Sequence, residues 1–315
     1  MSSFSEGLKM RRFIAVDWGT TNFRAFLMQG NGACLDSVQS DQGVLSVQNR
    51  DFLAVIVTNL SKWLQEDSSL PIIMSGMVGS KVGWFDVPYV ELPFDSSALV
   101  KGAHKVSVDK FNIWIIPGVQ ADSLEGNVDV MRGEEVQVIG AQAIAAANQL
   151  SYMNICLPGT HSKWLVYRDG HLTLSTFMTG ELFSLLSQHS ILSRTLDDPA
   201  IWSESDFNRG VADSAQSGLG LLHNLFGVRT KKLFPGTDSL HSQSYLSGLL
   251  IGAEIYPMLP YVRSGLVVVA ASKLLTLYSQ AFEAFSCPVL AIDSNDATQM
   301  GLISIFESIY NLGEL

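Results

Sequence analysis

The residues best suited to chemistry near the N-terminus stand in a short polar turn, residues 17–22 (Asp-Trp-Gly-Thr-Thr-Asn). Largely apolar segments, 13–16 and 23–27, lie on its two sides, so the pattern predicts a β-hairpin. Such a turn can bind a phosphate, because Gly19 lets the anion approach the backbone closely. Asp17 would repel a bare phosphate but suits a Mg²⁺ ion placed between them. The turn therefore indicates half of a magnesium–nucleotide clamp, with an ordinary hairpin capped by an aspartate as the alternative.

A second turn of the same kind stands in the second half of the chain. The Gly-Thr-His-Ser sequence of residues 159–162 aligns with the Gly-Thr-Thr-Asn of residues 19–22, and apolar strand patterns flank it. Internal repetition of this kind predicts a duplicated fold with one anion-binding turn in each half. His161 in isolation would be typical of a loop histidine with a backbone partner, but in this turn it is a candidate phosphate donor.

A glycine-spaced loop, residues 75–84, follows a short buried-type strand at residues 71–74. In an open α/β sheet, ligands bind at the carboxyl ends of the strands. Three glycines together with Ser80, Lys81 and Trp84 favour a binding loop over a plain connector.

Two adjacent acids, Glu134 and Glu135, precede an alanine-rich helix predicted over residues 136–148. Acids at a helix start complement the helix dipole, and on this stretch alone that explanation is favoured. The alternative is that one of them is a general base, which takes the proton of a reacting hydroxyl in phosphoryl transfer.

Composition narrows the classes of protein. With 315 residues, 47% of them hydrophobic, 16% charged and a mean hydropathy of +0.22, the chain is expected to form two globular lobes. No apolar run approaches the ~18 residues that span a bilayer, and the N-terminus lacks a signal-type segment. Three widely spaced cysteines, Cys34, Cys156 and Cys287, indicate reduced thiols in the cytoplasm.

The net charge of −10 argues against a nucleic-acid partner. An anionic substrate would therefore need a local positive field. The candidate cations are Arg11, Arg12, Arg24, Lys81, Arg132 and Lys163.

Strands alternate with helices in the second half, which predicts an α/β protein. Helices are expected over residues 52–64, 206–226, 243–256, 273–285 and 297–310. P-loop, Rossmann, nucleophile-elbow and His-Glu-x-x-His motifs are missing, so those classes of site are excluded.

Taken together, these motifs resemble the actin/hexokinase-like superfamily of ATP-dependent sugar kinases, and within it the 2-dehydro-3-deoxygalactonokinase family. The segments that carry the resemblance are residues 14–25, 76–84, 112–118, 130–135, 158–164, 178–182 and 246–254. The resemblance implies a two-lobed, duplicated α/β fold of ribonuclease H-like type with a nucleotide cleft between the lobes. The expected lobes are residues 1–140, with the first phosphate hairpin and sugar-acid loop, and residues 141–315. For the last helix, the alternative is that it packs back on the first lobe.

The resemblance also implies an activity, transfer of the γ-phosphoryl group of ATP to the 6-hydroxyl of 2-dehydro-3-deoxy-D-galactonate in galactonate catabolism. Asp17 would hold Mg²⁺. The implied nucleotide-binding residues are Gly19, Thr20, Thr21, Asn22, Gly159, Thr160, His161, Ala271 and Ser272. Ala271 stands where the adenosine motif of the superfamily usually has a glycine, so the sequence departs from the motif at the implied adenine site.

The catalytic base of the superfamily is an aspartate in a Gly-Asp-Gln stretch, and Gly133-Glu134-Glu135 occupies that place here. Glu134 is therefore expected to be the base, with Glu135 as the alternative. The implied substrate-binding residues are Arg24, Gly76, Met77, Gly79, Ser80, Lys81 and Trp84, with Arg24 and Lys81 as candidates for the substrate carboxylate.

Three alternatives stay open at this point. The scaffold could act on another sugar or sugar acid, or it could be an ATPase or phosphatase of the superfamily. A sugar-sensing regulator is disfavoured, because the first hairpin begins by residue 13 and leaves no space for a DNA-binding module. The oligomeric state is left open, a homodimer included.

Overall fold

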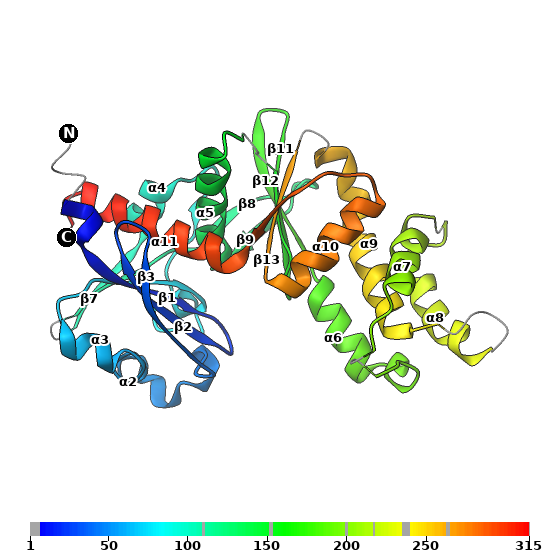
Figure 1. Ribbon diagram of the computed structural model, residues 1–315, viewed down its shortest axis with the longest axis horizontal. Coiled ribbons are helices and arrows are strands. Elements are labelled where there is room, and N and C mark those ends of the chain that lie inside the picture. Colours follow the sequence, from blue (N-terminus) through cyan, green and yellow to red (C-terminus); the bar gives the residue numbers. More distant parts are fainter. Residues whose placement is uncertain are drawn as a thin grey trace. The chain divides into compact units, whose positions relative to one another are not determined.

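The computed structural model describes residues 7–108, 111–150, 154–198, 201–216, 218–234, 240–262 and 265–314. The chain divides into two compact units (Figure 1). The first unit comprises Met1–Ser151 and Ser294–Leu315, and the second comprises Tyr152–Asp293.

The first unit is built on a six-stranded mixed sheet in the order β3-β2-β1-β4-β7-β6. Its strands are β1 (Arg12–Trp18), β2 (Phe23–Gln29), β3 (Cys34–Ser40), β4 (Ile72–Gly76), β6 (His104–Val108) and β7 (Phe111–Ile115). The first three strands form an antiparallel meander, and β4 and β7 continue the sheet in parallel to β1. β6 closes the edge antiparallel to β7. The predicted first hairpin is therefore confirmed as β1 and β2.

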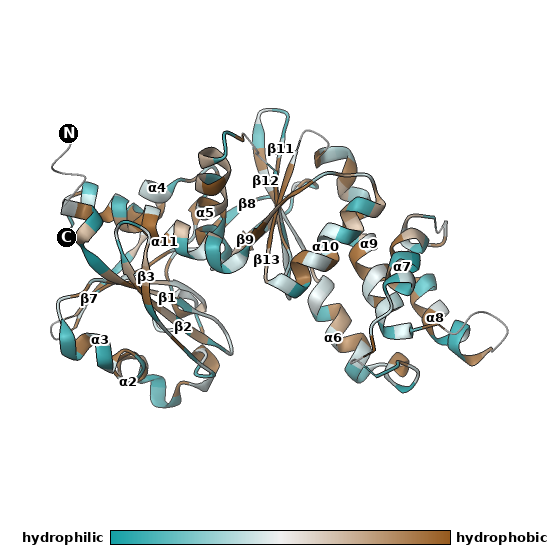
Figure 2. Ribbon diagram, viewed as in Figure 1, coloured by the Kyte–Doolittle hydropathy of each residue, from teal (hydrophilic) through white to brown (hydrophobic). Residues whose placement is uncertain are grey.

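Helices cover this sheet on both faces. Successive side chains of a strand point to opposite sides, so β1 packs against different helices with its two faces. Trp18 of β1 meets Phe52 of α2 edge-on at 5.5 Å on one face. On the other face Phe13 of β1 stacks on Phe306 of α11 at 4.2 Å. The helices of the first unit are α2 (Phe52–Asn59), α3 (Ser61–Glu66), α4 (Ser96–Gly102), α5 (Glu134–Ala147) and α11 (Ser294–Asn311). Figure 2 shows hydrophobic residues along the inner strands of the sheet.

The last helix belongs to the first unit because α5 and α11 approach closely at two glycines. A Cβ on Gly140 would lie 1.8 Å from the carbonyl oxygen of Ala297. One on Gly301 would lie 2.0 Å from the carbonyl oxygen of Val136. The lobe boundary expected at residue 140 thus falls inside α5, and the division lies beyond the end of that helix.

Short elements complete the first unit and shape its loops. A three-stranded sheet in the order β5-β8-β9 consists of β5 (Val90–Glu91), β8 (Val119–Asp122) and β9 (Val128–Met131). The 3-10 helices are η1 (Val44–Ser46), η2 (Gln48–Arg50) and η3 (Met77–Gly79).

The second unit repeats the sheet of the first. Its five strands run in the order β12-β11-β10-β13-β14. They are β10 (Asn154–Leu157), β11 (Ser162–Arg168), β12 (His171–Phe177), β13 (Leu266–Ala270) and β14 (Leu290–Asp293). As in the first unit, two antiparallel pairs are followed by two parallel pairs. The two sheets therefore share one topology, which the repeated glycine turns had predicted.

The helices of the second unit are α6 (Thr179–His189), α7 (Glu204–Gln216), α8 (Gly220–Leu233), α9 (Ser242–Val262) and α10 (Ser272–Ala284), with the 3-10 helix η4 (Ile191–Arg194). The single helix expected over residues 206–226 is wrong, because α7 ends at Gln216 and α8 begins at Gly220, whose φ of +75° interrupts a helix.

Glycines let α7 and α9 approach closely, since a Cβ on Gly248 would lie 2.0 Å from the carbonyl oxygen of Phe207.

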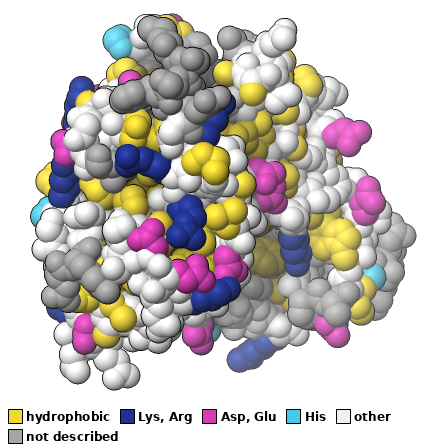
Figure 3. Space-filling model, turned by 60° about the vertical axis from the view of Figure 1, so that its left-hand side comes forward, with side chains coloured by type: hydrophobic (Ala, Val, Ile, Leu, Met, Phe, Trp, Pro, Cys, Tyr) yellow, Lys and Arg dark blue, Asp and Glu magenta, His cyan; other side chains and the backbone are white. Residues whose placement is uncertain are grey.

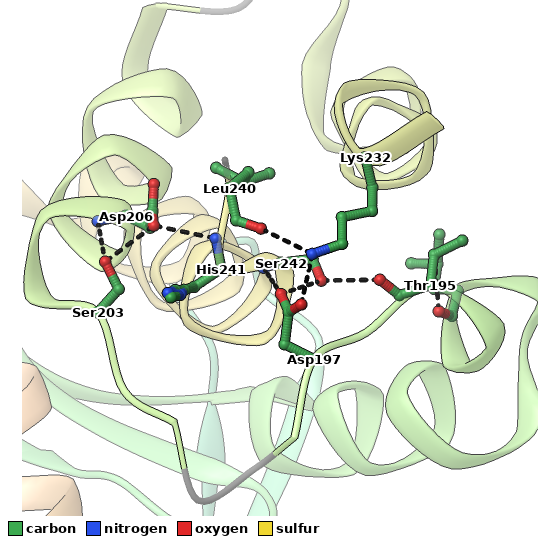
Figure 4. A network of polar contacts seen from close by, with 9 residues as sticks. Thr195, Asp197, Ser203, Asp206, Lys232, Leu240, His241 and Ser242 are labelled. Carbon is green, nitrogen blue, oxygen red and sulfur yellow. Dashed lines mark hydrogen bonds and ion pairs between the residues drawn. The ribbon is translucent and has the colours of Figure 1, made fainter. Parts of the chain in front are cut away.

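Two aspartates hold the start of α9 (Figure 4). Asp197 accepts hydrogen bonds from the backbone N–H of Ser242 at 2.7 Å and from its hydroxyl at 3.0 Å, and it also pairs with Lys232 of α8. Asp206 of α7 accepts from the backbone N–H of His241 at 3.0 Å. These bonds satisfy N–H groups at a helix start and fix the connection between η4 and α7 against α9.

The visible surface carries no concentrated basic area over the described residues. On the face drawn in Figure 3, Lys and Arg side chains are scattered among acidic and hydrophobic ones. Within the described ranges, no helix has the length and apolar character that crossing a membrane requires.

Candidate active site

The first polar turn is a tight, rigid connection between β1 and β2. The N–H of Gly19 donates to the carbonyl of Asn22 at 2.9 Å, and the N–H of Val44 donates to the carbonyl of Gly19 at 3.0 Å. Gly43 packs against the back of the turn, where a Cβ would lie 2.3 Å from the Cα of Thr21. Thr20, Thr21 and Asn22 are exposed, so their polar groups stay available to a ligand.

Asp17 stands at the end of β1 directly opposite Arg24 of β2. The Arg24 guanidinium donates to the Asp17 carboxylate at 2.5 Å and to the side-chain oxygen of Asn295 at 3.3 Å. The side chain of Asp17 is 17% exposed, so the carboxylate is reachable. Arg24, which the sequence suggests for a substrate carboxylate, is therefore placed against the suggested metal ligand.

Three backbone segments of the first unit converge beside Asp17. Gly76 ends β4 with a φ of +90°, and a Cβ there would lie 2.9 Å from the carbonyl oxygen of Trp18 and 3.3 Å from Oδ1 of Asp17. Gly133 has a φ of +108°, and its Cβ would lie 3.3 Å from the Cα of Gly76. The first turn, the glycine-spaced loop and the start of α5 are thus brought together, and both glycines adopt backbone conformations that side chains disfavour.

The two acids at the start of α5 both bond back to the preceding backbone. Glu134 Oε2 accepts from the N–H of Arg132 at 3.0 Å, and Glu135 Oε2 accepts from the N–H of Gly133 at 2.6 Å. Glu134 is half-buried, whereas Glu135 is fully buried. Both acids hold the backbone that leads into α5, and Glu134 is the one with solvent access.

Glu135 is held in an environment that disfavours its charge. Its Oε1 has no hydrogen-bond partner among the described residues. Burial, together with the charge of Glu134, raises the pKa of Glu135 to about 8. Glu135 is therefore mostly protonated at neutral pH, which makes Glu134 the better candidate for a base.

The glycine-spaced loop is compact. The N–H of Trp84 donates to the carbonyl of Val78 at 2.8 Å, and the Ser80 hydroxyl donates to the carbonyl of Met77 at 2.7 Å. The Trp84 ring stacks on Phe52, with 6.1 Å between the ring centroids. Gly76 and Gly79 are buried, Met77, Ser80 and Trp84 are half-buried, and Lys81 is exposed. Lys81 is thus free to reach an anionic group, while Trp84 anchors the loop to the core.

Arg132 supports this loop from behind. Its Nη2 donates to the carbonyl of Val87 at 2.8 Å, and its guanidinium lies 4.3 Å from the centre of the Tyr89 ring. A Cβ on Gly79 would lie 3.0 Å from Arg132 Nη1. Sequence reasoning named Arg132 as a cation but assigned it no role at the site. Its place directly before Gly133 and Glu134 is the signal that could have found it.

The second turn lies against the start of α6. The N–H of Glu181 donates to the carbonyl of Thr160 at 2.9 Å. A Cβ on Gly180 would lie 2.3 Å from the carbonyl oxygen of Gly159. His161 Nε2 lies 2.5 Å from a carboxylate oxygen of Glu181. Thr160 and His161 are exposed, so the second turn presents them to solvent as the first turn presents its threonines.

A cavity of about 270 Å³ opens beside the second turn within the second unit. Its wall is mostly apolar, from Phe183 of α6, Ile201 and Trp202 of the connection before α7, and residues of α9 and α10. Its polar lining comes from Gly159, Thr179, Gln243, Ser247, Lys273 and Tyr278. A mostly apolar cavity with a few polar groups is typical of small-molecule sites.

Ala271 and Ser272 are exposed at the start of α10, next to the lining residue Lys273. Ala271 has a φ of −66° and a ψ of 148°, which is ordinary extended backbone. An alanine is therefore accommodated without strain where the superfamily usually has a glycine.

A divalent cation at this site would be held mainly by the phosphate groups of a bound ligand and by water. In the part of the chain that the structure describes, no three His, Cys, Asp or Glu side chains group as a metal site. One accessible carboxylate, Asp17, nevertheless fits Mg²⁺, which usually binds one or two carboxylates and keeps several waters.

The repeated sheets, each with its glycine turn, define the actin/hexokinase-like α/β fold. A solved structure of the same fold is the activator of the 2-hydroxyisocaproyl-CoA dehydratase from Clostridium difficile with bound ADPNP. It is 10% identical, has a TM-score of 0.50, and the match covers 97% of this chain and 98% of that one.

Closer relatives identify the family. The model of the 2-keto-3-deoxy-galactonokinase family matches residues 17–305. The 2-dehydro-3-deoxygalactonokinase of Escherichia coli K12 is 39% identical over 303 residues, 95% of this chain and 99% of the relative. A solved structure from Sinorhizobium meliloti, provisionally named a 2-dehydro-3-deoxygalactonokinase, is 33% identical with a TM-score of 0.83, covering 95% and 97% of the two chains. The chain therefore belongs to the 2-keto-3-deoxy-galactonokinase family and is an ATP-dependent kinase, which confirms the resemblance and fold expected from the sequence.

Proposed function

We propose that this chain transfers the γ-phosphoryl group of ATP to the 6-hydroxyl of 2-dehydro-3-deoxy-D-galactonate, with the 6-phosphate and ADP as products in galactonate catabolism. The observation that carries the proposal is the convergence of Asp17, Gly76 and Gly133 in the first unit. This convergence supports a site in which the Asp17 carboxylate, the loop that carries Lys81 and the candidate base Glu134 act on one small acceptor. The names of the relatives supply the acceptor.

The candidate site residues of the first unit then have separate roles in the reaction. Glu134 takes the proton of the acceptor's 6-hydroxyl while the oxygen of that hydroxyl attacks the γ-phosphorus of ATP. The bond between the γ-phosphorus and the β-phosphate oxygen breaks, and ADP leaves. Mg²⁺ bound near Asp17 would neutralise charge on the phosphate oxygens. Lys81 binds the substrate carboxylate, while Arg24 orients the Asp17 carboxylate through their ion pair.

The nucleotide base is assigned to the cavity of the second unit, and each glycine turn is assigned phosphate binding within its own unit. In the first unit residues 19–22, and in the second unit residues 159–161, offer backbone N–H groups and hydroxyls to phosphate oxygens. The apolar wall with Trp202 suits a purine base, and Lys273 at the same cavity is a cation for the nucleotide. Ala271 and Ser272 lie at the rim. We place the reaction in the cytoplasm, because Cys34, Cys156 and Cys287 are all free thiols.

The product identifies the reaction. Incubation with Mg–ATP and 2-dehydro-3-deoxygalactonate is expected to release ADP and give a phosphate ester whose phosphorus NMR signal couples to two protons, as a primary C6 ester requires. A signal coupled to one proton would place the phosphate on a secondary hydroxyl and overturn the assignment. Equal ADP release without the acid would favour an ATPase.

A further inference from the structure

Glu254 is a buried carboxylate in the second unit that the proposed reaction does not use. It lies on α9 and is only 2% exposed. Its Oε1 accepts from the indole N–H of Trp164 at 2.9 Å. Its Oε2 accepts from the hydroxyl of Tyr278 at 2.6 Å and from the hydroxyl of Thr179. Both carboxylate oxygens are therefore occupied by donors.

These donors come from three elements, of which α6 and α10 line the cavity of the second unit. Trp164 belongs to β11, the return strand of the second turn, and Thr179 is the first residue of α6. Tyr278 belongs to α10 and lies 3.0 Å from the hydroxyl of Ser162, which begins β11. Thr179 and Tyr278 themselves line the cavity. One carboxylate thus joins the second turn, the start of α6 and α10.

Stability alone gives a weak reason for such a group. Burial raises the pKa of Glu254, and the hydrogen bonds from Thr179, Tyr278 and Trp164 oppose that rise. Trp164, Thr179 and Tyr278 are all neutral donors, so these three hydrogen bonds do not pair the carboxylate with a cation. Buried charged networks are often replaceable by apolar residues with little loss of stability. A fully satisfied polar network also rigidifies the elements that it joins, and it can thereby fix the geometry of a binding site.

The contacts of the second turn depend on these elements. Thr160 accepts from the N–H of Glu181, and Gly159 lies against Gly180, both in the first turn of α6. Thr179 precedes them and is bonded to Glu254. A shift of α6 relative to β11 would therefore move Gly159 and Thr160, the residues assigned to the phosphates.

We propose that Glu254 is a positioning residue for the nucleotide, which holds the second turn, the start of α6 and α10 in the arrangement that binds ATP. This inference rests on the proposed function of the second turn and its cavity. Glu254 itself stays away from the ligand and acts through Thr179, Trp164 and Tyr278.

The test compares two tyrosine variants on this unit. Tyr278→Phe removes the hydroxyl that donates to Glu254, and Tyr245→Phe removes a hydroxyl that donates to Asp213 at 2.6 Å. Tyr245 lies on α9, as Glu254 does, but it bonds to α7 and does not line the cavity. Both variants lose a tyrosine–carboxylate bond, so a comparable loss of thermal stability is expected.

Nucleotide binding should separate them. Titration calorimetry with ADP, well below the unfolding temperature, is expected to show about tenfold weaker binding for Tyr278→Phe and for Glu254→Gln, and a change below about twofold for Tyr245→Phe. In turnover, the KM for ATP should rise with little change in the KM for the sugar acid. If Glu254→Gln does not fold, Tyr278→Phe carries the test.

Wild-type affinity for ADP in both Tyr278→Phe and Glu254→Gln would overturn the positioning role and leave the proposed kinase function in place. Equal weakening in Tyr245→Phe would also overturn it, because the effect would then follow general stability. Failure of the wild-type protein to bind ADP or ATP would instead contradict the proposed nucleotide site itself.

Discussion

Gly133 lies so close to Gly76 that a Cβ on Gly133 would be 3.3 Å from the Cα of Gly76. Both residues have positive φ angles, +108° and +90°. The loop after β4 and the start of α5 therefore touch through backbone beside Asp17. This contact fixes the distance between the suggested base and the suggested metal ligand.

Gly133→Ala should damage both folding and catalysis. The φ of +108° is strained for any side chain, which costs about 1–3 kcal/mol of unfolding free energy. The added methyl also pushes Glu134 away from the loop, so kcat should fall more than stability explains. Denaturant unfolding together with kcat measures both effects. Gly126→Ala, also at positive φ but with nothing within 4 Å, is the matched control and should leave kcat unchanged.

Glu134→Gln should lower kcat by roughly 10²–10⁴-fold, the usual contribution of a general base. The KM values for ATP and for the sugar acid should change much less, because the amide keeps the size and the hydrogen bond of Glu134 to the Arg132 N–H. Steady-state kinetics with both substrates varied would measure this. Full turnover by the variant would remove Glu134 from the mechanism and leave it as a support of the backbone that leads into α5.

Glu135→Gln should change the pH dependence of stability. The folded-state pKa of about 8 lies above the ordinary value of 4.5, so the unfolded chain loses this proton first. Wild-type stability should therefore fall as pH rises from about 4.5 to about 8, by up to a few kcal/mol from this group. Thermal unfolding across that range should show a smaller decline for Glu135→Gln. Parallel curves for the two proteins would show that folding does not raise the pKa of Glu135.

Arg24 and Lys81 should show different defects. Lys81 is exposed on the loop, so Lys81→Met should raise the KM for the sugar acid about tenfold and leave the Mg²⁺ dependence unchanged. Arg24 pairs with Asp17 at 2.5 Å, so Arg24→Met should shift the Mg²⁺ concentration needed for half-maximal rate. Titrations of each variant with sugar acid and with Mg²⁺ measure the two effects. The reverse pattern would assign the substrate carboxylate to Arg24.

Much of the fold follows from local sequence patterns. The two hairpins were predictable, because apolar strands flank glycine turns and a turn of this kind joins neighbouring strands. The motifs around Gly76 and Gly133 were also found from the sequence, but their contact was not, since it depends on how β4 and α5 pack. Periodicity did not separate α7 from α8 either, as the patterns of two consecutive helices merged into one.

Burial distinguishes Glu134 from Glu135, which the sequence does not. Adjacent residues on a helix point in directions about 100° apart, so one acid turns to the core while its neighbour keeps solvent access. Which one turns inward depends on how α5 packs, and α5 packs closely against α11 at Gly140. Arg132 was undervalued for a related reason, since its role rests on contacts with Val87 and Tyr89 that are distant in sequence.

The acceptor specificity of ADP formation tests the central claim most directly. Mg–ATP turnover would be measured in a coupled assay with 2-dehydro-3-deoxygalactonate, its gluconate epimer, a neutral hexose and no acceptor. The proposed function predicts turnover with the keto-deoxy acids, highest with the galactonate, and little ADP from the hexose or the blank. Turnover confined to the neutral hexose, or equal ADP release in the blank, would contradict it and leave only the fold and the family in place.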